Sequence, residues 1–366
     1  MGVALPVLNY SLSPLKIPCK AGHGEWTQYR MFIARQEDVM AGKRAVSFHW
    51  KVTVGACLAS VALSGLAQQV YPNRPLRLIA PLAPGGTTDI LARTMSQQLS
   101  GSLGQPVVVE NRAGAGGTVG TDFVAKSPPD GYTLLIVSAD TYTTNAVLYT
   151  NLPFDSRKDL RPLSILAASP SLLTVHPSLP VKSVKELVAL SKARPKDLNY
   201  GSGGTSGVLR MELLKFNTGM IITNIPYKGS GPALIDQIAG HVHVGFFNMV
   251  ATLPQVQAGK LRGLVVTGGK RAEQLPNVPS TVEAGIKGFD ENVGYLMLVP
   301  SATPGAIVAR LNGDIVKVLH RPEVKSRLAS EGSEVVGSTS EQAVAVVNQL
   351  IDQWQDVVRK TGIKLQ

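Results

Sequence analysis

The chain has 366 residues, 44% of them hydrophobic, which is enough for a sizeable core in one large or two medium domains. Its formal net charge is +11, but the charges are scattered and no Lys/Arg-rich run occurs, so nucleic acid is not an expected partner. The composition also excludes a disordered or collagen-like chain.

The N-terminal part of the sequence has the pattern of an export signal. A basic stretch, residues 43–51, precedes an apolar run of small residues, Val52–Leu66. Gly65 and Ala67 fit the small −3 and −1 positions of a signal peptidase site. The run has 15 residues, which is short for a membrane span. We therefore expect residues 40–67 to be a signal peptide cleaved after Ala67, with a membrane anchor as the alternative.

Residues 1–39 show no clear periodicity and do not resemble a leader. A start codon assigned too far upstream would explain such a stretch. Met40 or Met31 would then be the true start. Both cysteines, Cys19 and Cys57, precede the expected cleavage site, so the remaining chain can form no disulfide or cysteine metal site. That chain keeps 29 basic against 22 acidic residues, a mild positive balance that favours anionic solutes.

Beyond the leader, short apolar runs alternate with helical patterns, which indicates α/β layers with largely parallel sheets. The expected strands are Leu76–Pro81, Val107–Glu110, Thr133–Ser138, Leu163–Ala168, Leu172–His176, Leu198–Tyr200, Ile222–Pro226, Val242–Phe247, Gly263–Thr267 and Tyr295–Val299. The expected helices are Thr88–Leu99, Thr118–Lys126, Ser183–Ala193, Gly207–Phe216, Pro232–Ala239, Thr252–Ala258, Ser280–Ala284, Pro304–Val318, Pro322–Ser330 and Ser340–Lys360.

Three of the expected strand-to-helix turns share a Gly-Gly-Thr sequence. They read "APGGTTD" at residues 83–89, "GAGGTVG" at 114–120 and "GSGGTSG" at 201–207. A helix start carries free N–H groups and a positive dipole end, and glycine lets an anion approach them. In open α/β sheets, ligands bind at the carboxyl ends of strands near such turns. The repetition favours an anion or polar-ligand site, with plain tight turns as the alternative.

Motifs for catalysis or metal binding are missing from this pattern. "GAGGTVG" has Val119 where a dinucleotide fingerprint needs its third glycine, and no P-loop, nucleophile elbow or zinc-protease motif occurs. His241 and His243 would share one strand face, but two imidazoles make a poor metal site. Asp89 and Glu110 could act as a carboxylate pair, although nothing fixes their separation; Asp89 suits the first turn of a helix. We expect no catalytic residue, metal or cofactor.

Six longer stretches together resemble the Bug family of extracytoplasmic solute-binding proteins, the receptors of tripartite tricarboxylate transporters. They are "APGGTTDILAR", "VVVENRAGAGGTVG", "PPDGYTLL", "LNYGSGGTSG", "PYKGSGPALIDQIAGHV" and "LPNVPSTVEAG". The likeness runs from about Tyr71 to the C-terminus, in order and with the usual spacing.

The resemblance implies an α/β type II periplasmic-binding-protein fold, in which two lobes close on a ligand like a hinge. The first lobe would comprise residues 68–172 and 296–366, and the second residues 173–295. The two crossovers would lie near Leu172–Val175 and Tyr295–Val299.

The resemblance also implies which residues hold a ligand carboxylate, partly through ordered water. From the first lobe these are Pro84, Gly85, Gly86, Thr87, Asp89, Ala115, Gly116, Gly117 and Ser138. From the second lobe they are Thr205, Ser206, Tyr227, Lys228 and Asn248. His243 and Phe247 stand where family members usually or often have an acidic residue, and the second change would alter the pocket wall. No arginine is expected at the cleft loops.

The function so implied is capture of a small carboxylate in the periplasm and its delivery to the membrane permease subunits of the transporter. The protein would act as a monomer, and its ligand would be a di- or tricarboxylate, an amino acid or an aromatic acid. One alternative is a sensory protein that presents its ligand-bound form to a membrane histidine kinase. Another is a hydrolase using Ser206 or Ser138, although neither serine has a recognisable base beside it in the sequence.

Overall fold

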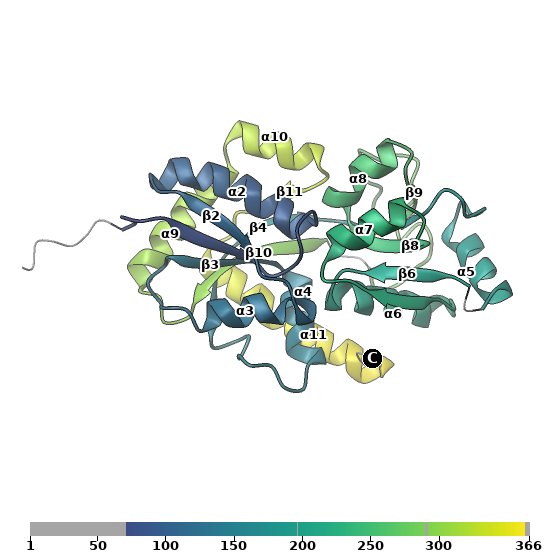
Figure 1. The fold of residues 1–366 in the computed structure, drawn as a ribbon, viewed down its shortest axis with the longest axis horizontal. Coiled ribbons are helices and arrows are strands. Elements are labelled where there is room, and N and C mark those ends of the chain that lie inside the picture. Colours follow the sequence, from purple (N-terminus) through teal and green to yellow (C-terminus); the bar gives the residue numbers. More distant parts are fainter. Residues whose placement is uncertain (1–70, 196, 290–291, 363–366) are drawn as a thin grey trace, which may run out of the picture. The chain divides into compact units, whose positions relative to one another are not determined.

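The computed structural model describes residues 71–195, 197–289 and 292–362 (Figure 1). The expected extension, residues 1–39, and the expected signal peptide, residues 40–67, lie outside these ranges. Within them, each helix is too short or too polar to cross a membrane.

The first sheet combines strands from both ends of the described chain, in the order β11-β4-β10-β3-β1-β2. Its strands are β1 (Leu76–Ala80), β2 (Val107–Asn111), β3 (Thr133–Ser138), β4 (Leu160–Ser169), β10 (Val293–Pro300) and β11 (Glu334–Val335). β1 runs parallel to β2 and β3, whereas β10 is antiparallel to β3 and β4.

Helices cover both faces of this sheet, because the strands are apolar on both sides. Along β3, Leu134 and Ile136 belong to one core cluster while Leu135 and Val137 belong to another. In Figure 1, α2 and α10 lie above the sheet, and α3, α4 and α11 lie below it. The helices of this lobe are α2 (Thr87–Leu103), α3 (Thr118–Ala125), α4 (Ala139–Leu148), α9 (Gly305–Leu319), α10 (Pro322–Ser330) and α11 (Ser340–Thr361).

The second sheet has the order β7-β6-β8-β5-β9 and forms the centre of a second lobe. Its strands are β5 (Ser171–Val175), β6 (Asn199–Ser202), β7 (Thr223–Pro226), β8 (Val244–Asn248) and β9 (Arg262–Val266). Its helices are α5 (Val184–Ala193), α6 (Thr205–Thr218), α7 (Ser230–Ile238) and α8 (Met249–Gln257). A core containing Leu173, Tyr200 and Phe246 lies within this lobe.

The chain changes sheets twice between β4 and β10. Pro170 separates β4 in the first sheet from β5 in the second, and residues 267–292 connect β9 back to β10. The stretches expected as crossovers therefore belong to the sheets themselves: Leu172–Val175 lies in β5 and Tyr295–Val299 in β10.

The expectation of largely parallel sheets was wrong. The described strands form four parallel and five antiparallel pairings. The antiparallel pairings all involve β4, β5 or β10, strands next to the two changes of sheet. The alternation of strands and helices in the sequence does not reveal that the chain passes from one sheet to another, and strands next to such a passage need not run parallel to their neighbours.

Two helix expectations also differ from the structure. Ser280–Ala284 was expected to be a helix but forms hydrogen-bonded turns. Gly285, which follows it, has a φ of +69°, and a right-handed helix cannot continue through this conformation. α4 was not expected, because its sequence "ADTYTTNAVL" is rich in threonine, a weak helix former without an apolar stripe. Its start is fixed by Ser138, whose hydroxyl accepts from the Thr141 N–H at 3.2 Å.

Candidate ligand site

Five helices begin around one small cavity between the two lobes. β3 and β8 run directly into a helix, and β1, β6 and β7 lead into one through a short loop. The residues that precede these five helices are Gly86, Ser138, Gly204, Gly229 and Asn248. A cavity of about 50 Å³ is lined by the first residues of all five helices and by parts of β8 and β10. The free N–H groups and positive dipole ends that gather there favour a negatively charged group.

Four of the predicted site residues line this cavity: Thr87, Ser138, Ser206 and Asn248. The remaining ten lie outside the cavity wall, Asp89 and Thr205 in the first turns of α2 and α6 and the others in the surrounding loops. The wall also contains residues that the sequence did not single out: Leu82, Thr88, Thr141, Gly203, Gly207, Arg210, Ser230, Phe246, Val293 and Tyr295. Of these, only Thr88, Gly203 and Gly207 lie inside the repeated Gly-Gly-Thr motifs, so only they could have been predicted from those motifs.

Asp89 holds the opening loop in shape. Its carboxylate accepts hydrogen bonds from the Gly85 N–H at 3.1 Å, from Arg93 at 3.1 Å and from the Asn111 amide at 3.0 Å. Burial raises the pKa of Asp89, but these hydrogen bonds outweigh burial and hold the pKa below its ordinary value. Gly85 has a φ of +83°, which glycine adopts without strain, so this loop depends on both residues.

The opening loop packs directly against the start of α7 in the second lobe. The Ala83 N–H donates to the Lys228 carbonyl at 3.0 Å. A Cβ atom on Gly231 would overlap the Pro84 carbonyl oxygen, and one on Gly86 would overlap the Ser230 hydroxyl. Side chains are therefore excluded at Gly86 and Gly231 by the opposite lobe, not by their own backbone conformation, since neither residue has a positive φ.

The "GAGG" loop forms the second contact between the lobes. Ala115, Gly116 and Gly117 have φ values of 43°, 62° and 97°. The Asn145 amide donates to the Gly116 carbonyl at 3.1 Å. A Cβ on Gly116 would lie 2.9 Å from the Thr205 methyl group, so this glycine too is required where the lobes meet.

Polar side chains of α4 and α6 join the lobes beside the cavity. The Thr141 and Ser206 hydroxyls lie 3.0 Å apart, and Thr141 also accepts from Ser138 at 2.8 Å. Arg210 of α6 pairs with Asp140 of α4 at 2.9 Å, with only 11% and 17% of the two side chains exposed. No arginine was expected at the cleft loops, but Arg210 lines the cavity from the second turn of α6, beyond the loop that the motifs mark.

Tyr227 and Lys228 lie at the edge of the site. The Tyr227 hydroxyl donates to Asp236 at 2.6 Å, and partial burial together with this carboxylate raises the pKa of Tyr227 to about 12. Lys228 meets the first lobe through its backbone carbonyl, while the residue itself is largely exposed.

The Ser138 hydroxyl contacts the hydroxyl and the backbone N–H of Thr141, and the Ser206 hydroxyl contacts the Thr141 hydroxyl. His243, a candidate metal-ligating residue, instead contacts Asn199 at 2.8 Å, and its pKa is lowered by burial. Among the residues that the structure describes, no group of three metal-ligating side chains forms. Phe247 packs with Ala233, Leu234 and Ala251 in a core cluster of the second lobe.

Residues 91–363 match the sequence model of a protein family described as the tripartite tricarboxylate transporter family receptor. The chain belongs to this family. It is 38% identical to Protein BugT of Bordetella pertussis over 313 residues, which cover 84% of this chain and 96% of BugT.

Solved structures show the same fold. The structure of R. palustris Rpa4515 with adipate shares 37% identity and a TM-score of 0.77, covering 80% of this chain and 99% of that one. The periplasmic binding protein BugD shares 32% identity and a TM-score of 0.78, covering 81% and 100%. The chain is thus a two-lobed α/β protein of a family of receptors and binding proteins, not of enzymes.

Proposed function

We propose that the protein binds a small carboxylate between its two lobes in the periplasm and delivers it to the permease subunits of a tripartite tricarboxylate transporter. The convergence of five helix N-termini from both lobes on one cavity carries this proposal. The adipate bound to Rpa4515 and the family's description as transporter receptors support the ligand class and the partner.

The carboxylate would be held mainly by backbone N–H groups and hydroxyls. Ser138, Ser206, Thr87 and Asn248 present polar side chains to the cavity from four different helix starts. Burial raises the pKa of Tyr295, which also lines the cavity, so its hydroxyl stays protonated and available as a donor.

Helix ends alone cannot supply the affinity. Each contributes about 0.3–1 kcal/mol at an exposed site and reaches about 2 kcal/mol only in favourable, partly buried geometries, whereas micromolar binding needs about 8 kcal/mol, more than five helix ends supply unless all of them act near that upper limit. The difference must come from contacts that lose water when the lobes meet around the ligand. The α4–α6 contacts and the packing of Gly86 and Gly231 are made only with the lobes together, so they couple closure to binding.

The cavity's size limits what it holds in this arrangement. About 15 Å³ is needed for each water-sized group, so about 50 Å³ accommodates little more than the carboxylate itself. The body of a larger ligand would extend beyond this cavity. We place the export signal at residues 40–67, as the sequence predicts, and the lobe boundaries at Pro170 and within residues 267–292, where the chain changes sheets.

A thermal-shift screen of C4–C8 dicarboxylates, aspartate, citrate and benzoate, followed by calorimetric titration, tests this function. A ligand at 100 times its Kd should stabilise the protein by about 2.7 kcal/mol. The matched control is Gly231→Ala, which should fold but be unable to close, so it should show no shift. The proposal fails if no carboxylate stabilises the wild type, or if the variant binds equally well.

A further inference from the structure

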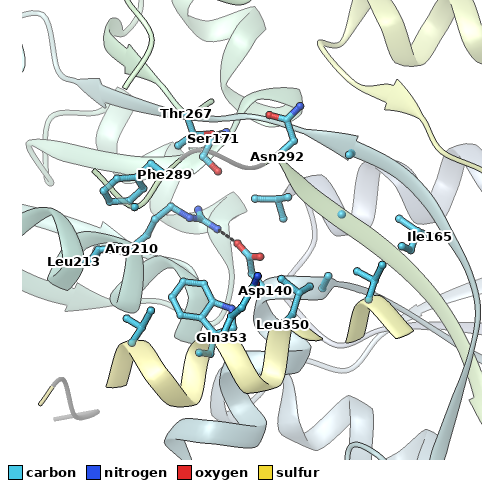
Figure 2. Close-up of a pocket in the computed structure, with 18 of the residues that line it drawn as sticks. Asp140, Ile165, Ser171, Arg210, Leu213, Thr267, Phe289, Asn292, Leu350 and Gln353 are labelled. Carbon is cyan, nitrogen blue, oxygen red and sulfur yellow. Dashed lines mark hydrogen bonds and ion pairs between the residues drawn. The ribbon is translucent and has the colours of Figure 1, made fainter. Parts of the chain in front are cut away.

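A second cavity in the described part of the chain lies beside the first one, between α4, α6 and α11. We call it the hinge pocket; its volume is about 630 Å³. Figure 2 shows α11, with Leu350 and Gln353, along one side, and Ser171, Thr267 and Asn292 on the other. These last three residues flank the two places where the chain changes sheets. Small-molecule pockets typically have volumes of about 300–1,000 Å³ and occur between domains, so this cavity is of the right size and place.

Two buried polar atoms of the hinge pocket have no hydrogen-bond partner. The Ser171 hydroxyl is one, in a residue that is 0% exposed. The Trp354 indole Nε1 is the other, and an indole N–H can only donate. An unsatisfied buried polar group costs about 1–3 kcal/mol, so such atoms need an explanation. In Figure 2 the Ser171 side chain points into the cavity.

The buried charges that line the hinge pocket cancel, because Asp140 and Arg210 pair with each other at 2.9 Å. The other two charged residues of the lining, Asp356 and Lys360, are exposed, and Asp356 pairs with Arg359 at 2.7 Å. A buried carboxylate would need a free cation, but Arg210 is already neutralised by Asp140. The rest of the wall is largely apolar and includes Ile165, Leu213, Phe289 and Leu350.

We propose that the hinge pocket is a second binding site, which takes an uncharged molecule with an apolar or aromatic body and a hydrogen-bonding oxygen such as a carbonyl. The oxygen accepts from Trp354 Nε1 or Ser171, and the body packs on the apolar wall. Arg210 and Val293 line both this site and the carboxylate site, but the proposal does not depend on the function proposed for the carboxylate site. Because its walls come from both lobes, its occupant would favour the closed arrangement.

Acetophenone and benzoate test the charge selectivity, since they have nearly the same shape and differ in charge. Trp354 is the only tryptophan besides Trp26 and Trp50, so the full chain with Trp26→Phe and Trp50→Phe reports on the pocket alone. Acetophenone should change the Trp354 emission saturably, and an excess of benzoate should not reverse that change. No saturable change, or displacement of acetophenone by benzoate, would overturn the proposal.

Two variants test the polar contacts by calorimetric titration with acetophenone. Trp354→Phe keeps an aromatic ring but loses the N–H, and Ser171→Ala loses the hydroxyl. One neutral hydrogen bond is worth about 0.5–1.5 kcal/mol, so at least one variant should bind about two- to twelve-fold more weakly. Ser156→Ala is the matched control, since the Ser156 hydroxyl is also buried and unpartnered but lines a different cavity.

The control separates a binding role from a merely structural one. Ser171→Ala and Ser156→Ala should both raise the Tm of the free protein slightly, because each removes an unsatisfied hydroxyl. Only Ser171→Ala or Trp354→Phe should weaken acetophenone binding. If both of these bind acetophenone as the wild type does, the pocket does not use these atoms and the proposal is wrong.

Discussion

At the scale of single residues, the glycines of the site serve two different purposes that the sequence alone does not distinguish. Gly85 is needed for its own backbone, with a φ of +83°. Gly86 and Gly231 are needed only because the opposite lobe approaches them. The sequence therefore predicted the importance of "APGGTTD" for two reasons, an anion's approach and a tight turn. The structure adds a third, the close contact between the lobes.

From this contact between the lobes we expect that a substitution at Gly231 abolishes binding without lowering stability. Gly231→Ala lies in the first turn of α7, where alanine suits a helix, so the free protein should be as stable as the wild type or up to about 1 kcal/mol more stable. Carboxylate binding should nevertheless be lost, because the new Cβ meets the Pro84 carbonyl, a backbone atom that cannot turn aside.

Gly86→Ala should also weaken carboxylate binding, but a second substitution should reverse this loss. Its new Cβ meets only the Ser230 hydroxyl, so affinity should fall and Ser230→Ala should restore much of it. Calorimetric titration and melting curves of both single variants and the double variant measure this. A Gly86→Ala protein with wild-type affinity would contradict the contact, and a lowered Tm without loss of affinity would favour the tight-turn explanation.

Asp89 predicts a pH dependence of stability. Its pKa is lowered in the folded state, so the ionised carboxylate contributes stability above its ordinary pKa, and this contribution is lost as the pH falls through the lowered value. Asp89→Asn should cost about 1–3 kcal/mol at pH 7, the range for hydrogen bonds to charged groups. In urea unfolding the difference should shrink steadily below about pH 4. A difference that stays constant to pH 3 would show that the charge of Asp89 is not what stabilises the loop.

At the scale of elements, the sequence was informative where apolar periodicity was strong. β3 (Thr133–Ser138) and α10 (Pro322–Ser330) have the predicted ends, and most other elements differ by a few residues. α4 could not be predicted in this way, since its threonines neither alternate nor form an apolar stripe. Its stability comes from the Ser138 cap and from packing against α6 and α11, which is tertiary information. Arg210 was missed for the same reason, because only α4 gives it a partner.

The Asp140–Arg210 ion pair between α4 and α6 should affect the affinity for the carboxylate. Asp140→Ala should leave Arg210 buried without its partner when the lobes meet, and should weaken carboxylate binding by about ten- to a hundred-fold, or about 1.5–3 kcal/mol. Asp140→Leu combined with Arg210→Met replaces the pair with apolar side chains of similar size, and such replacements are often neutral. The double variant should thus recover most of the affinity. If it binds as weakly as Asp140→Ala, Arg210 contacts the ligand itself.

At the scale of the whole molecule, the sequence motifs gave the fold and the two lobes, but not the positions where the chain changes sheets. Pro170 and residues 267–292 make these connections. A proline after a strand is an ordinary turn signal, and only the pairing of β5 with β8 and β9 shows that the next strand belongs to another sheet. These two connections are where the chain passes between the lobes.

Closure around a ligand predicts a change in solution scattering. The contacts at Gly86 and Gly231 and between α4 and α6 require the lobes to be together, so the free protein should be more extended and the carboxylate-bound protein more compact. Small-angle scattering should therefore show a smaller radius of gyration when a carboxylate from the screen saturates the wild type. Gly231→Ala should keep the larger radius at the same ligand concentration, because the Pro84 carbonyl blocks the approach of α7. A wild-type profile that does not change at saturation, with binding confirmed by calorimetry, would show that the ligand enters a cleft that is already closed.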